Sequence, residues 1–144
     1  FFTVYGPWGR PDMAYFMFTK SIYENKEISV FNEGNLSRDF TYIDDIIEGI
    51  KRVLITKSKN KALNRIYNIG NNSAVNLNDF ISIIENIIDK KSKKVMLPMQ
   101  QGDVKKTWAD VSLLISDYSY SPKTPIEKGI KKFISWYNEY YKKI

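Results

Sequence analysis

The 144-residue sequence contains no cysteine and no histidine. Without cysteine, the chain can form neither a disulfide nor a thiolate metal site. Without histidine, it lacks the commonest general base near neutral pH and the commonest metal ligand. A Ser-His-Asp or Cys-His catalytic arrangement is therefore excluded within this chain. Both absences fit a metal-free protein of the cytoplasm, which is what we expect.

Glycine is also scarce, and its spacing excludes one common phosphate-binding motif. No group of glycines follows the G-x-G-x-x-G pattern of a dinucleotide-binding turn. The seven glycines are at positions 6, 9, 34, 49, 70, 102 and 129.

Long apolar runs are missing too. No run approaches the roughly 18–20 residues of a membrane span, so we expect no membrane partner. The opening stretch, residues 1–6, is apolar but has no basic lead-in and no small-residue cleavage site, unlike a signal peptide. Because the sequence begins with Phe1 rather than Met, we expect it to continue a longer chain.

The charge of the chain is positive, with a formal net charge of +6. Lysines gather in residues 57–61, 90–94 and 142–143. Such clusters can mark a nucleic-acid or membrane surface. Solvated loops and helix ends explain them better, because two of the clusters follow predicted helices, whose carboxyl ends favour cations. We therefore expect no nucleic-acid partner.

Hydrophobic spacing predicts an α/β fold. The predicted strands are residues 1–5, 28–31, 38–42 and 65–69, and the predicted helices are residues 12–25, 43–54, 77–88 and 125–141. Asn76 is the expected cap of the third helix, and Thr124, Pro125 and Glu127 mark the start of the fourth. Helices with one apolar side must pack against a sheet or another unit.

Few residues in this sequence could carry chemistry. Asp44 and Asp45 are adjacent at the start of a predicted helix, where carboxylates favour the helix dipole rather than facing each other. Arg38 could bind a phosphate, but local sequence favours a simple pair with Asp39. Residues 100–103 have the composition of an exposed polar loop. Such a segment is usually only a connection, although loops also carry binding sites.

Four segments, in order, resemble the extended short-chain dehydrogenases/reductases that epimerise nucleotide sugars. The version Trp8-Gly9-Arg10-Pro11-Asp12-Met13 is most similar to UDP-glucuronate 4-epimerases of the capsule type. The four segments are residues 1–14, residues 38–45, residues 67–70, and residues 102–104 with 109–111.

The resemblance implies a role for individual positions. Thr3 would meet the sugar, the Val4 backbone would approach the nicotinamide of NAD, and Arg10 would lie near the sugar carboxylate. At the nucleotide end, Phe31 and Asn32 would hold the uracil, Arg38 the diphosphate and Asp103 the ribose. Gln100 stands where the glucose epimerases carry a second diphosphate-binding arginine, which favours the glucuronate branch.

The resemblance also implies that a Rossmann half is absent. In the family that half binds NAD and supplies the catalytic Tyr-x-x-x-Lys, and this chain contains neither motif. Family chemistry oxidises C4 of the sugar, rotates the 4-keto sugar and reduces it again. We therefore expect residues 1–144 to be the carboxy-terminal, substrate-binding domain, with residues 1–6 a strand of the missing half, no catalytic residue, no tightly bound NAD and no turnover alone.

Partners follow from the same expectation. We expect the chain to bind a UDP-sugar and, through apolar faces that normally meet the Rossmann half, either that half or a second copy as a homodimer. The alternatives are the UDP-glucose or UDP-GlcNAc 4-epimerase/dehydratase branch, or a non-catalytic nucleotide-sugar-binding or dimerisation module.

Overall fold

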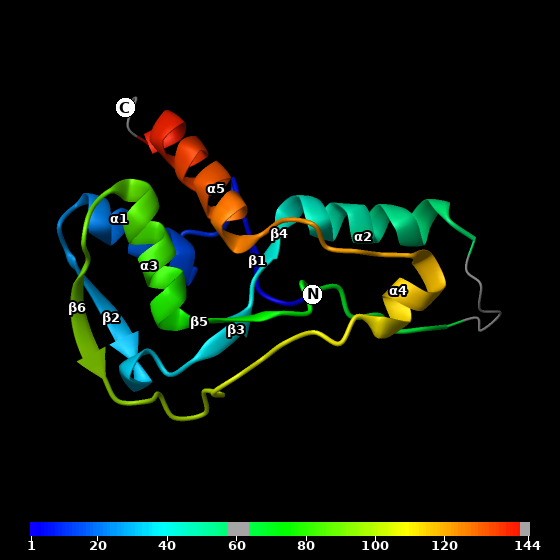
Figure 1. Ribbon diagram of the computed structural model, residues 1–144, viewed down its shortest axis with the longest axis horizontal. Helices are drawn as coiled ribbons and strands as arrows, with labels where there is room; N and C mark the ends of the chain where they lie inside the picture. Colours follow the sequence, from blue (N-terminus) through cyan, green and yellow to red (C-terminus); the bar gives the residue numbers. More distant parts are fainter. Residues whose placement is uncertain (58–63, 142–144) are drawn as a thin grey trace.

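The computed structural model describes residues 1–57 and 64–141, and it confirms the predicted α/β class (Figure 1). Most of the lysines in the 57–61 and 142–143 clusters lie outside the described residues. No helix within the described ranges is long and apolar enough to cross a membrane.

The strands are short, and each pairs with a strand that is not its neighbour in the sequence. β1 pairs with β4 and β2 with β6 in parallel, while β3 and β5 are antiparallel. The strands are β1 (Val4–Tyr5), β2 (Glu27–Phe31), β3 (Ser37–Asp39), β4 (Thr41–Tyr42), β5 (Ala74–Asn76) and β6 (Lys93–Leu97), with a 3-10 turn η1 (Asn32–Gly34). The helices are α1 (Ala14–Tyr23), α2 (Ile43–Ile55), α3 (Leu77–Ile88), α4 (Ser112–Tyr118) and α5 (Ile126–Tyr141).

The helix predictions are largely confirmed. α2, α3 and α5 lie where the apolar spacing predicts them, and the Asn76 side chain caps α3 by accepting a hydrogen bond from the Asn78 amide at 2.8 Å. The predicted strand at residues 65–69 is wrong, because its one described backbone bond, from the Phe2 amide to the Ile69 carbonyl, builds no ladder. β5, β6 and α4 were not predicted.

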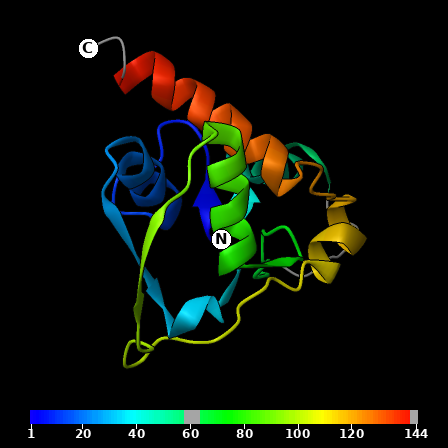
Figure 2. The same cartoon turned by 60° about the vertical axis from the view of Figure 1, so that its left-hand side comes forward.

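Two apolar clusters build the core. The larger one joins α1, α3 and α5 to β2 and β4, and Phe40 stacks on Phe80 within it at 4.2 Å between ring centroids. The smaller one lies under α2 and α4 and includes Ile46, Leu114 and Tyr120. Figure 2 shows α5 running across the upper ends of α1 and α3. The core therefore holds the start of α1 and the carboxyl end of β2 in fixed positions.

Two buried carboxylates join segments that are far apart in the sequence. Asp39 is fully buried and accepts hydrogen bonds from the Asn71 and Ala109 amides, each at 2.9 Å, and from the Thr41 hydroxyl. Asp45 accepts from the Lys123 and Thr124 amides just before α5. The helix-start position predicted for Asp45 is confirmed, and its carboxylate also anchors the segment that leads into α5.

Candidate functional site

A cavity of about 540 Å³, the main cavity, lies between α1, β2 and the strands that follow. Three of the residues singled out from sequence, Thr3, Phe31 and Arg38, line it. Most of the remaining lining is apolar, with Phe18, Phe40 and other core residues on its walls. An apolar cleft with few polar groups is the usual form of a small-molecule site.

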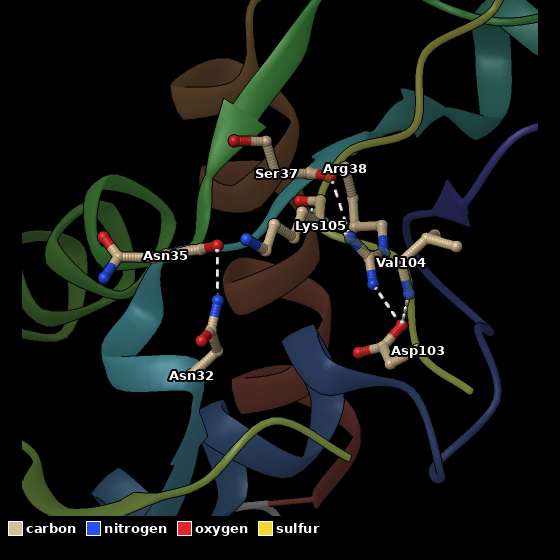
Figure 3. A network of polar contacts seen from close by, with 7 residues as sticks. All are labelled: Asn32, Asn35, Ser37, Arg38, Asp103, Val104 and Lys105. Atoms are coloured by element: carbon tan, nitrogen blue, oxygen red, sulfur yellow. Dashed lines mark hydrogen bonds and ion pairs between the residues drawn. The ribbon is translucent and has the colours of Figure 1, made fainter. Parts of the chain in front are cut away.

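Arg38 reaches this cavity from β3, and its guanidinium is fixed by one neighbouring and two distant partners (Figure 3). It donates to Asp103 Oδ1 at 2.5 Å, to the Ser37 carbonyl at 2.9 Å and to the Lys105 carbonyl at 3.5 Å. Both side chains of the Arg38–Asp103 pair are partly buried. The local Arg38–Asp39 pair favoured by sequence is therefore wrong, because Asp39 is already used by backbone amides.

The loop that carries Asp103 is itself held in a turn. The Asp103 amide donates to the Gln100 carbonyl at 3.2 Å, and the Val104 amide donates to the Asp103 carboxylate at 2.8 Å. Gln100 is exposed and does not line the main cavity. The structure therefore brings Asp103 to Arg38, although Asp103 itself does not line the main cavity, and it leaves the Gln100 side chain at the surface.

Asn32 follows Phe31 but takes no part in the cavity wall. Its side-chain amide donates to the Asn35 carbonyl at 3.0 Å, and its backbone adopts a left-handed conformation with φ of 51°. Figure 3 shows this contact closing the η1 turn. Asn32 therefore shapes the turn that ends β2, while Phe31 faces the cavity.

A second cavity of about 330 Å³ lies beside the loop of residues 6–12, and Val4 and Arg10 line it. Met13 and Tyr15 line both cavities, so the two form neighbouring parts of one region. Burial raises the pKa of the Tyr15 phenol, which stays protonated near neutral pH. Sequence reasoning missed both residues because their helical spacing is equally typical of core.

Arg10 is held only locally. Its guanidinium pairs side-on with the Asp12 carboxylate through Nε and one terminal nitrogen, and its side chain is 76% exposed. The hydrogen bond from Arg10 lowers the pKa of the Asp12 carboxyl below its ordinary value. A guanidinium bound along one edge keeps donors on its other edge for a second anion.

The loop of residues 6–12 has an unusual backbone. Gly6 adopts a φ of 145°, a region that L side chains rarely occupy. Trp8 has a φ of 62°, which costs a bulky residue roughly 1–2 kcal/mol. A Cβ at Gly9 would lie 1.6 Å from the Tyr15 hydroxyl, so only glycine fits there. The two glycines of this loop therefore stand where its backbone conformation and close packing require them.

Val4 is the position that the sequence resemblance assigns to the nicotinamide. Val4 lies on β1 at the second cavity, where its backbone is pinned beside β4 by the Thr41 amide, which donates to the Thr3 carbonyl at 2.9 Å. The sequence has no Gly-rich turn for the cofactor's diphosphate. Within the described residues, no group of three or more carboxylates that could hold a metal ion occurs.

Comparisons with known proteins identify the family. Residues 1–70 match the NAD dependent epimerase/dehydratase family. Protein CapI of Staphylococcus aureus is 49% identical over 99% of this chain and 47% of its own length. UDP-glucuronate 4-epimerase 5 of Arabidopsis thaliana is 46% identical over 98% of this chain and 35% of its own length.

A solved structure gives the same result in three dimensions. UDP-glucuronic acid 4-epimerase from Bacillus cereus, in complex with UDP-glucuronic acid and NAD, superposes with a TM-score of 0.89 and 37% identity. The match covers 97% of this chain and 44% of that one. The chain thus spans about half the length, or less, of these relatives. It belongs to the NAD-dependent epimerase/dehydratase family and corresponds to a carboxy-terminal part of its members.

Proposed function

We propose that the chain is the UDP-sugar-binding part of an NAD-dependent UDP-glucuronate 4-epimerase. The observation that carries the proposal is Arg38, fixed by Asp103 and Ser37 at the wall of an apolar cavity that Phe31 and Thr3 also line. Supporting it are the similarity to UDP-glucuronate 4-epimerases and, for a role in capsule or cell-surface polysaccharide synthesis, the similarity to CapI.

The main cavity suits the uridine diphosphate. Its apolar wall, with the Phe31 ring, covers a flat base, and the Arg38 guanidinium offers a charge-assisted contact to the diphosphate. A guanidinium has five N–H donors, so the bonds to Ser37, Asp103 and Lys105 leave capacity for a phosphate oxygen. We propose that the Asp103 carboxylate, which holds Arg38 but does not itself line the cavity, accepts from a ribose hydroxyl.

The second cavity suits the sugar. Thr3 and Val4 are consecutive and line the main and second cavities respectively, and Tyr15 lines both, so the two cavities are neighbours. Arg10 supplies the cation for a carboxylate on the sugar. This cation favours glucuronate over the UDP-glucose and UDP-GlcNAc branches, in which the sugar is neutral.

Turnover needs groups that this sequence lacks. In the family, bound NAD would supply hydride-acceptor and hydride-donor chemistry at C4 of the sugar. The chain contributes binding and orientation: Val4 provides one edge of the cofactor site, and Thr3, Arg10 and Arg38 hold the substrate. Without Tyr-x-x-x-Lys and a Gly-rich turn, the chain alone is inactive.

Exposed apolar residues give the chain a surface for a partner. On α2, Ile47, Leu54 and Ile55 are 55%, 78% and 71% exposed, and Ile66 is 91% exposed. Solvent-facing apolar side chains of this size on one helix are typical of an interface. The Rossmann half is the occupant we propose, with a homodimer of this chain as the alternative.

Calorimetric titration of UDP into the wild-type chain and Arg38→Ala tests the proposal. The variant should bind UDP about 10- to 100-fold more weakly, because it loses a charge-assisted contact. Arg65→Ala is the matched control, since Arg65 pairs with Asp117 away from both cavities. Absence of binding to wild type, or equal affinity in Arg38→Ala, would contradict the proposed pocket.

A further inference from the structure

Trp8 combines an unfavourable backbone with an exposed side chain. Its φ is 62°, and the residue is 73% exposed. Its ring nevertheless contacts α5, at 5.3 Å from the Trp136 ring and 4.9 Å from the Tyr140 ring, measured between centroids. Trp136 and Tyr140 stack on each other at 5.6 Å. We call these three residues the aromatic clamp.

The clamp joins the loop of residues 6–12 to a helix more than a hundred residues away in the sequence. Within the loop, the Gly9 amide donates to the Gly6 carbonyl and the Met13 amide to the Arg10 carbonyl, each at 3.2 Å. These bonds close two turns, and the second joins the loop to Met13 at the start of α1, but neither reaches α5. The Trp8 ring therefore supplies a tertiary attachment on the exposed side of the loop.

Arg10 follows Trp8 by two residues on the same loop. Asp12 orients the Arg10 side chain, but Asp12 belongs to the same loop and moves with it. The position of the guanidinium relative to the rest of the second cavity therefore depends on how the loop is fixed. Tyr15 limits the loop from inside, at Gly9, and the aromatic clamp holds it from outside.

We propose that Trp8 is a positioning residue through which α5 places Arg10, and that the aromatic clamp thereby sets the preference for a UDP-sugar with a carboxylate over a neutral one. The second half of this inference rests on the proposed function. Arg10 makes the contact to the ligand, and Trp8 acts only through Arg10.

The first test needs no ligand. Amide hydrogen exchange at Gly9 and Met13 is measured by NMR in wild type, Trp8→Ala, Trp8→Phe and Tyr140→Ala. Trp8→Ala and Tyr140→Ala should each accelerate exchange at both amides by about tenfold, and Trp8→Phe should restore most of the protection. Trp108→Ala is the matched control, because Trp108 is 54% exposed and contacts Lys106 instead of α5. Unchanged exchange in both clamp variants would overturn the proposal.

The second test measures the preference itself. Calorimetric affinities for UDP, UDP-glucose and UDP-glucuronate are compared in the same variants. Loss of the clamp should lower the ratio of UDP-glucuronate to UDP-glucose affinity by about fivefold to tenfold and leave UDP affinity unchanged. A simple loss of stability would weaken all three ligands together. An unchanged affinity ratio in Trp8→Ala would overturn the specificity role of the aromatic clamp. If the wild-type chain does not bind UDP at all, the proposed function is contradicted, and the amide-exchange experiment alone tests whether the clamp positions the loop.

Discussion

Arg38 is held by partners 65 and 67 residues away in the sequence, whereas Arg10 is held by a carboxylate two residues away. The Arg38 side chain is 24% exposed and the Arg10 side chain 76%. The proposed nucleotide end of the site is therefore part of the tertiary structure, and the proposed sugar end is a loop attached to it. A partly buried, cross-linked cation suits the proposed nucleotide end, while an exposed loop suits the proposed sugar end.

The largest effect should follow from breaking the tertiary junction behind Arg38. Asp39→Ala removes the acceptor of the Asn71 and Ala109 amides and leaves both donors unpaired beside a fully buried position. We expect it to lower the free energy of unfolding by roughly 3 kcal/mol or more, measured by urea denaturation. Asp44→Ala is the control, because Asp44 makes a surface pair with Lys132 and should change stability little. If Asp39→Ala and Asp44→Ala have a similar free energy of unfolding, the hydrogen bonds of Asp39 do not stabilise the structure behind Arg38.

A smaller and more selective effect should follow at the sugar end. Arg10→Ala should weaken UDP-glucuronate binding by about tenfold through loss of a charge-assisted contact, and leave UDP and UDP-glucose affinity unchanged. Calorimetry with the three ligands measures it, and the exposed Arg10 makes a folding defect unexpected. An equal loss for UDP and UDP-glucuronate would mean that the two ends are not separate.

The smallest effect concerns the titration of Asp12. Its pKa is lowered from the ordinary value of 3.8 by the hydrogen bond from Arg10, so the pair is fully formed above that pH and is lost as the pH falls through the lowered pKa. A carbon-detected NMR titration should show this shift, and Arg10→Ala should return the pKa toward 3.8. High salt should reduce the shift, because both groups are exposed. If the pKa of Asp12 is the same in wild type and Arg10→Ala, the Arg10–Asp12 pair does not form in solution.

Sequence was a good guide wherever the cause of structure is local. The apolar spacing of α2, α3 and α5 and the Asn76 cap are set by residues within a few turns of each other. β6 was missed because it begins with Lys93 and Lys94 and becomes a strand only by pairing with β2, 66 residues earlier. The stretch at 65–69 has strand-like composition but no ladder partner within the described residues.

The candidate site divides in the same way. The resemblance singled out Arg38 and Asp103 separately, but their pairing depends on a fold that brings β3 to the loop after β6. Arg10 and its loop were named from the motif, yet the contact of Trp8 with α5 spans the length of the chain and has no local signal. The ligand-binding roles of all these residues, and of Thr3, Val4, Phe31, Asn32 and Gln100, stay predictions. Asn32, Gln100 and Asp103 line neither cavity.

The most direct test of the account is an NMR titration of the wild-type chain with UDP, followed by UDP-glucuronate. UDP should shift the amide signals of Phe31, Arg38 and Asp103, and the sugar should add shifts in residues 6–13, while α2 and α4 stay unchanged. Shifts confined to α2 and α4, or none at saturating UDP, would contradict the claim that this chain carries the UDP-sugar site.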